Sequence, residues 1–235
     1  MNIFHPHAAG RSPAGTRFGH VETWVFDLDN TLYPFGCSLW PQIDARITAF
    51  LAEMFGIDGL SARALQKYYY ERYGTTLKGL MEEHVMTADD FLAFVHDIDR
   101  TSVEPDAGLG AAIAALPGRK LILTNGSREH AVKTTERLGI RHLFEDVFDI
   151  VAAGLVPKPE AAAYELFFEK HGVDPSRSAM FEDIARNLLV PHARGMVTVL
   201  VTEPALPAPA AKSHVDFMTS DLEMFLAGLA TGLDT

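Results

Sequence analysis

The segment ETWVFDLDNTLYP occupies Glu22 to Pro34 of a 235-residue chain. Its apolar run Trp24-Val25-Phe26 predicts a short buried strand, which leads directly into Asp27 and Asp29. Because side chains alternate along an extended chain with a period of two, both carboxylates point to the same side. Two like charges this close repel each other and raise each other's pKa. The segment therefore indicates a site that supplies a compensating positive charge.

The composition narrows the class of protein. Apolar residues make up 48% of the chain, which is enough for a sizeable core. The net charge of −11 argues against binding a nucleic acid polymer, although a local site could still bind a small anion. A single cysteine, Cys37, excludes an internal disulfide and suits a reducing compartment. No apolar run reaches membrane-spanning length, so we expect a soluble, cytoplasmic protein with no membrane partner.

Helical and strand patterns divide the chain into three parts. Residues 1–20 are rich in Gly, Pro, Ala and His and are expected to form a flexible N-terminal arm. Residues 37–104 read as four consecutive helices and are expected to form a helical cap domain. Residues 21–36 and 105–235 alternate strands with helices, which predicts a parallel sheet; a strand over residues 146–153 and a helix over residues 185–195 are among these elements. The expected fold class is α/β, with a doubly wound, Rossmann-like core and an inserted all-helical cap.

Polar side chains stand at four predicted strand exits, where ligands of such sheets bind. In chain order they are Asp27 and Asp29; Thr124 and Asn125, followed by Gly126 and Ser127; Lys158; and Glu182 with Asp183. The four acidic residues would form a pocket that is unfavourable without a cation, and oxygen ligands of this kind suit Mg²⁺. The Thr124 hydroxyl, backbone N–H groups at a helix start and Lys158 suit an anion such as phosphate.

At this point the sequence resembles a known family. The motifs "DLDNT", "LTNG", "PKP" and "FED" match, in order, the four motifs of the haloacid dehalogenase superfamily. The helical insert falls where the C1-type cap of its first subfamily lies, and the resemblance covers the chain from about Val25 to its end. The flanking "DNTLYP" and "FEDIARN" look most like the pyrimidine 5′-nucleotidase-like branch.

The resemblance implies a role for each motif residue. Asp27 would attack phosphorus and form an aspartyl-phosphate, and Asp29 would act as general acid and then as general base. Thr124, Asn125 and Lys158 would bind the phosphate. The Mg²⁺ ligands would be Asp27, the Asp29 backbone carbonyl and Asp183, with Glu182 binding directly or through water. Dehalogenases of the superfamily lack an acid at the position of Asp29, so its presence favours phosphate chemistry.

Several alternatives stay open on the sequence alone. We expect a small phosphomonoester substrate, and a pyrimidine nucleoside 5′-monophosphate is the leading candidate. Phosphoglycolate, a sugar phosphate or a non-catalytic role in binding phosphorylated metabolites are the alternatives. The ten histidines show no metal-binding spacing and are expected at the surface or in the core. Tyr69 and Tyr73 share a helix face and are expected to pack the cap. The sequence does not determine the oligomeric state.

Overall fold

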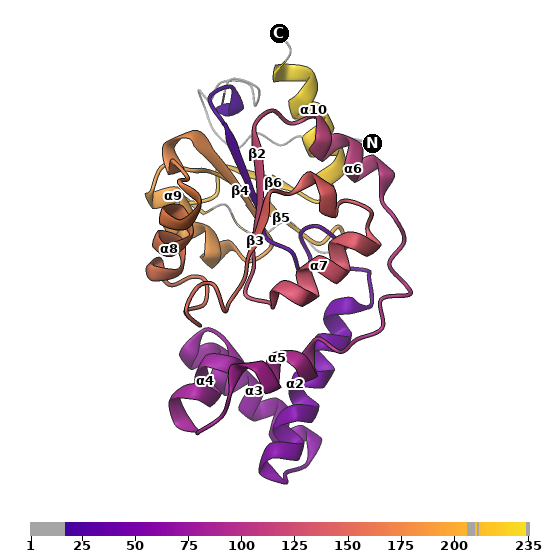
Figure 1. Cartoon of the computed structure of the whole chain (residues 1–235), viewed down its shortest axis with the longest axis vertical. Helices are drawn as coiled ribbons and strands as arrows, with labels where there is room; N and C mark the ends of the chain where they lie inside the picture. The colour runs from indigo at the N-terminus through magenta and orange to yellow at the C-terminus, as the bar shows by residue number, and fades with distance from the viewer. Residues whose placement is uncertain (1–16, 206–209, 211, 234–235) are drawn as a thin grey trace.

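Six parallel strands form one sheet in the order β3-β2-β1-β4-β5-β6 (Figure 1). The computed structural model describes residues 17–205, 210 and 212–233. The strands are β1 Thr23–Phe26, β2 Arg119–Leu123, β3 Asp146–Phe148, β4 Ser178–Glu182, β5 Val197–Val201 and β6 Phe217–Thr219. This sheet confirms the predicted α/β fold class with a doubly wound core.

The first strand lies in the middle of the sheet, between β2 and β4. Val25 is in register with Leu121 on one side and with Met180 on the other. All four residues of β1 are buried, and three of them, Trp24, Val25 and Phe26, are apolar. Because the three strands run parallel, their carboxyl ends meet at one edge, and the chain leaves β1 there toward Asp27.

Two helical layers cover the sheet, and side-chain alternation along β1 assigns a core to each. Trp24 and Phe26 join an apolar cluster with residues of α6 Ala107–Ala115, α7 Arg128–Arg137 and α10 Leu222–Leu233. Val25 points to the opposite face, toward α8 Ala161–His171. Figure 1 shows α8 and α9, Leu189–Ala193, on one side of the sheet and α6, α7 and α10 on the other.

Four helices lie beyond the carboxyl edge of the sheet and have an apolar cluster of their own (Figure 1). They are α2 Leu39–Phe55, α3 Gly59–Tyr73, α4 Thr76–Glu83 and α5 Ala88–Val95. Tyr69 is buried in this cluster, as the helical spacing suggested. Thr87 is the N-cap of α5, and its hydroxyl accepts from the N–H of Asp90. We propose that residues 37–104 form the cap domain.

Three local expectations differ from the structure. Phe18 is fully buried and stacks against Trp24, so the end of the expected N-terminal arm packs on the core. Residues 1–16 of that arm lie outside the described residues. The strand expected over residues 146–153 ends at Phe148, because the Asp149 carboxylate accepts from the N–H groups of Arg128 and Ala152 and turns the chain.

The third difference concerns the helix expected over residues 185–195. A 3₁₀ helix, η3, spans Ala185–Leu188, and the short α9 follows it. Pro191 has no N–H to donate, so it fits in the first turn of a new helix and not within a continuous one. Two further 3₁₀ turns are η1 Arg141–Leu143 and η2 Pro175–Arg177. In the part of the chain that the structure describes, no helix has the length and apolar character needed to cross a bilayer.

Candidate active site

Lys158 contacts residues at the carboxyl ends of three neighbouring strands, β1, β2 and β4. Its Nζ lies 2.6 Å from Asp27 Oδ1, 2.7 Å from Glu182 Oε1 and 2.8 Å from the carbonyl oxygen of Leu123. Lys158 is only 2% exposed, and burial alone would lower its pKa. The charges of Asp27 and Glu182 outweigh that effect and raise the pKa of Lys158. The ammonium group is therefore charged and fixed against the candidate nucleophile.

Three of the four carboxylates expected in an acidic pocket lie together, and the side chain of the fourth, Asp29, is not part of this cluster. One oxygen of each of Asp27, Glu182 and Asp183 lies within 4.8 Å of the other two. Burial, with the charges of Glu182 and Asp29 added, raises the pKa of Asp27 to about 7 although Lys158 lowers it. Burial and the charges of Glu182 and Asp27 raise the pKa of Asp183 to about 9. Buried oxygen ligands that repel each other in this way fit a hard divalent cation such as Mg²⁺.

The hydrogen bonds of Glu182 distinguish it from the two aspartates. Its Oε1 accepts from Lys158 and, at 2.6 Å, from the Asn187 side chain, while its Oε2 accepts from the Ile184 N–H at 2.7 Å. Asp183 accepts a long bond of 3.4 Å from Asn30, a residue whose positive φ of 55° suits asparagine. Asp27 and Asp183 thus keep more acceptor capacity for a metal ion than Glu182 does.

The residues after β2 form the side of the site where an anion was expected. The Thr124 Oγ1 accepts from the Gly126 N–H at 2.9 Å and still has its own hydrogen to donate. The Asn125 side chain accepts from the Lys158 N–H at 2.8 Å and donates to the Lys158 carbonyl at 3.2 Å. Asn125 therefore holds the loop that carries Lys158, a link that the sequence reading did not include. Contact of either residue with phosphate stays a prediction.

Asp29 has two hydrogen-bond partners that the sequence reading missed. Its Oδ1 lies 2.6 Å from the Tyr33 hydroxyl and 2.8 Å from Nε2 of His130. Burial would raise the pKa of Asp29, but these interactions outweigh burial and lower it to about 2. His130 lies at the start of α7, three residues after Ser127. A polar side chain this close to the end of a strand was the sequence signal available for its contact with Asp29. Helix packing, which spacing does not reveal, determines the contact.

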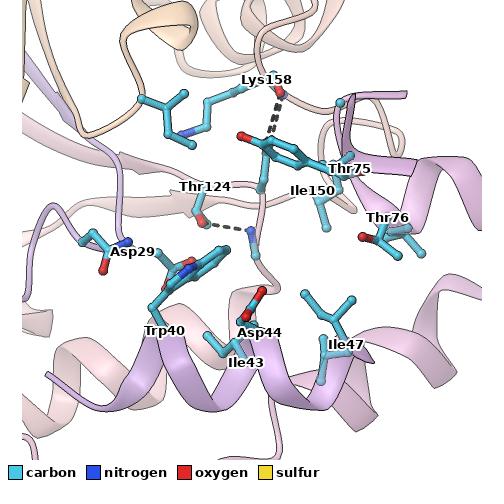
Figure 2. Close-up of a pocket in the computed structure, with 18 of the residues that line it drawn as sticks. Asp29, Trp40, Ile43, Asp44, Ile47, Thr75, Thr76, Thr124, Ile150 and Lys158 are labelled. Carbon is cyan, nitrogen blue, oxygen red and sulfur yellow. Dashed lines mark hydrogen bonds between the residues drawn. The ribbon is translucent and has the colours of Figure 1, made fainter. Parts of the chain in front are cut away.

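A cavity of about 460 Å³ opens between these residues and the four helices. Figure 2 shows Trp40, Ile43, Asp44 and Ile47 of α2 along one wall, with Asp29, Thr124 and Lys158 on the sheet side. The apolar part of the wall includes Ile43, Ile47, Leu77, Phe91, Leu92, Val95 and Ile150. Such a wall, with few polar groups, suits a small organic ligand.

Two polar clusters interrupt the apolar wall: Asp44 with its partners on α3, and Arg186 with Tyr70. Asp44 of α2 accepts from Gln66 of α3 at 2.9 Å and pairs with Arg63. On the sheet side, the guanidinium of Arg186 lies over the Tyr70 ring, 4.4 Å from its centroid. All five residues line the cavity, and none of them was predicted as a site residue. They are the polar groups available to the part of a ligand that extends toward the helices.

The chain matches a known protein family and a curated yeast protein. Residues 21–190 match the model of a family described as haloacid dehalogenase-like hydrolases. Phosphate metabolism protein 8 of Saccharomyces cerevisiae is 26% identical over 179 residues, which are 69% of this chain and 55% of that protein. The chain thus spans about half the length of the curated relative it matches.

Two solved structures share the fold. A haloacid dehalogenase phosphatase from Thermococcus onnurineus has a TM-score of 0.58 at 14% identity, covering 87% of this chain and 96% of that one. The L-2-haloacid dehalogenase from Xanthobacter autotrophicus with chloropropionic acid covalently bound has a TM-score of 0.56 at 16% identity, covering 88% and 97%. Because the fold hosts both activities, it does not select between them. The family match over most of the chain does settle its class: the protein belongs to the haloacid dehalogenase-like hydrolases.

Proposed function

We propose that the protein is a Mg²⁺-dependent phosphohydrolase that cleaves a small phosphomonoester through an aspartyl-phosphate on Asp27. The observation that carries the proposal is the arrangement of Asp27, Lys158 and Asp183 in the lining of the cavity. It places a carboxylate nucleophile beside a fixed positive charge and a cluster suited to a divalent cation. The match to a yeast protein named for phosphate metabolism supports phosphate as the transferred group.

The first chemical step would form one bond to phosphorus and break another. A carboxylate oxygen of Asp27 attacks phosphorus, and the bond from phosphorus to the ester oxygen breaks as that oxygen takes a proton from Asp29. Lys158 donates to Asp27 Oδ1, so Oδ2, with its long 3.5 Å bond from Thr31, is the less engaged oxygen. Asp29 must first take up a proton, which the negative charge of a bound phosphate favours.

The second step would hydrolyse the aspartyl-phosphate. Water attacks phosphorus and gives its proton to Asp29, while the bond to Asp27 breaks and inorganic phosphate leaves. The low pKa of Asp29 keeps this carboxylate ionised before the step, as a base must be. Bound Mg²⁺ would offset the charge of the phosphate oxygens. Asp27 and Asp183, with the backbone carbonyl of Asp29, would hold the ion, and Glu182 would mainly fix Lys158.

We propose a pyrimidine nucleoside 5′-monophosphate as the leading substrate and a cytoplasmic location. Phosphoglycolate and sugar phosphates are the alternatives. The substrate proposal rests on the resemblance of the "DNTLYP" and "FEDIARN" segments to the pyrimidine nucleotidase branch and on a cavity large enough for more than a phosphate group. The position of Asp29 beside Asp27 favours phosphate release over halide release, because a haloacid offers no leaving oxygen to protonate.

The test is phosphate release from UMP, CMP, phosphoglycolate and sugar phosphates, with 2-chloropropionate and a halide assay as the comparison arm. Each substrate is assayed with Mg²⁺, with chelator and with the Asp27→Asn variant. We expect Mg²⁺-dependent phosphate release that Asp27→Asn lowers by at least about 1,000-fold. Ligand binding without turnover would favour a binding protein, halide release would favour a dehalogenase, and an active Asp27→Asn would remove the nucleophile.

A further inference from the structure

His130 lies between the candidate acid–base residue and the chain that returns from the helices to the sheet. Its side chain is fully buried, and its Nε2 lies 2.8 Å from Asp29 Oδ1. Its Nδ1 lies 2.9 Å from Nη2 of Arg100. Both ring nitrogens of His130 therefore have a partner. Nε2 contacts Asp29 of the candidate site, and Nδ1 contacts Arg100, which follows α5. A buried polar ring with two charged partners needs a physical explanation beyond packing.

Arg100 fixes the tautomer of this histidine. A guanidinium group has N–H donors and no acceptor, so Nδ1 of His130 must accept the bond from Arg100. The ring hydrogen then resides on Nε2, which donates to Asp29 Oδ1. The direction of the hydrogen bond to Asp29 is thus determined by Arg100, about which the motifs of the sequence carry no information.

Arg100 is itself held by the chain around it. Its guanidinium donates to the carbonyl oxygens of His96 and Ile98 at 3.1 and 3.2 Å. The ring of His96 stacks on His130 with centroids 4.5 Å apart, and Ser127 Oγ lies 2.9 Å from its Nδ1. Burial lowers the pKa of His96 to about 3, so His96 stacks as a neutral ring. The folded chain after α5 thereby fixes the position of His130.

The two donors to Asp29 engage the same oxygen. Tyr33 and His130 both reach Oδ1, and among the described residues no hydrogen bond reaches Oδ2. A carboxylate held through one oxygen keeps its plane and leaves the other oxygen for proton exchange. The arrangement is expected where the direction of a proton transfer matters, because transfer requires a short and aligned path.

We propose that His130, held by Arg100, is a positioning residue that orients Asp29 so that Oδ2 exchanges the proton with the leaving oxygen of the substrate. The inference rests on the proposed function and deepens it. In the first step the proton on Oδ2 moves to the ester oxygen as its bond to phosphorus breaks. In the second step Oδ2 takes the proton of the attacking water. His130 itself gives up no proton and touches no substrate.

The test compares leaving groups that differ in their need for a proton. p-Nitrophenyl phosphate has a leaving group that departs without one, whereas an alkyl phosphomonoester such as UMP requires protonation. The measured quantity is kcat/KM with Mg²⁺, because it reports only the steps through transfer to Asp27. His130→Phe keeps the aromatic ring and removes the donor, while His130→Gln keeps a donor at the position of Nε2.

For His130→Phe we expect kcat/KM to fall by at least about 100-fold on the alkyl ester and by less than about threefold on p-nitrophenyl phosphate. His130→Gln should restore at least about a tenth of the activity on the alkyl ester. The control is His171→Phe, which replaces another histidine with a mostly buried side chain, packed against Phe148 and Phe167 and outside the cavity lining. It should not change the ratio of the two activities.

The outcomes separate the two proposals. An equal loss on both substrates in His130→Phe would make His130 merely structural and would overturn the inference while leaving the proposed function. If neither substrate were hydrolysed by the unchanged protein, the proposed function would fall, and the role of His130 with it. If His130→Phe does not fold, Arg100→Ala decides, since it frees the tautomer and should lower activity on the alkyl ester alone; an equal loss there also overturns the inference.

Discussion

Lys158 Nζ and Asp27 Oδ1 lie 2.6 Å apart with side chains that are 2% and 8% exposed. The pair is therefore a buried ion pair, and Glu182 adds a second carboxylate to the same ammonium group. Removing one member of such a pair leaves uncompensated charge in the interior. The stability of the fold and the chemistry of the site consequently depend on the same side chain.

Replacing that side chain should destabilise the fold. We expect Lys158→Met to lower the free energy of unfolding at pH 7 by about 3–5 kcal/mol, because two buried carboxylates lose their cation. The measurement is urea-induced unfolding. Lys78→Met, which breaks the more exposed Lys78–Glu160 pair, is the control and should cost at most about 1 kcal/mol. Equal losses in the two variants would contradict the interpretation.

The metal-free protein should become less stable as the pH rises. The pKa values of Asp27 and Asp183 are raised to about 7 and about 9, so the folded state binds these protons more tightly than the unfolded chain. The stability they contribute is complete below about pH 4 and is lost as the pH rises through both folded values. We expect the free energy of unfolding in chelator to fall by at least about 1 kcal/mol from pH 6 to pH 9. Asp183→Asn should flatten this dependence, and a dependence unchanged in the variant would exclude Asp183 as its source.

The affinity for Mg²⁺ should rise with pH, whereas the stability of the metal-free protein falls, because the same two protons are involved. The ion must displace protons from Asp27 and Asp183, so its affinity should be at least about fivefold higher at pH 8 than at pH 6. Calorimetry in buffers of different ionisation enthalpy measures both the affinity and the protons released. Asp183→Asn should abolish binding, whereas Asp174→Asn, at an exposed carboxylate outside both the acidic cluster and the cavity lining, should leave it unchanged. Affinity independent of pH would argue against this cluster as the metal site.

Filling the cavity should separate large substrates from small ones. Ile47 lies on the apolar wall formed by α2 (Figure 2), and Ile47→Trp would occupy part of the 460 Å³. We expect KM for UMP to rise by about tenfold or more, while turnover of a small ester such as methyl phosphate changes by less than about threefold. Leu60→Trp, at a position 82% exposed on α3, is the control. The same effect on both substrates would show that the leaving group does not use this wall.

The fold was accessible to sequence reasoning because local and global patterns agree. The apolar run Trp24–Phe26 predicted a buried strand, and the residues at the carboxyl ends of β1, β2 and β4 meet because those strands are parallel neighbours. Asp27, Glu182 and Asp183 come together for that reason, and Lys158 reaches them from the chain that follows β3. Their proposed roles come from the resemblance, and the geometry leaves them as proposals to be tested.

What escaped sequence reasoning depends on packing. His130 and Arg100 are separated by 30 residues and lie on different elements, so no spacing rule connects them to Asp29. Tyr70 gave no signal either, because the run of three tyrosines does not reveal which ring faces the cavity. β3 ends early, at Phe148, because the Asp149 side chain accepts a hydrogen bond from the Ala152 N–H and turns the chain. This local hydrogen bond outweighs the apolar pattern of the following residues, which favours a strand.

The position of Arg100 in the chain affects how the helical insert can be exchanged between related proteins. A chimera that imports a foreign helical insert with junctions at residues 37 and 104 would discard Arg100 together with the cavity wall. Its His130 would then be free to adopt the other tautomer, in which Nε2 no longer donates to Asp29. Junctions placed at Ser38 and between Val95 and His96 would transplant new specificity while retaining Arg100 and the native support of the acid–base residue.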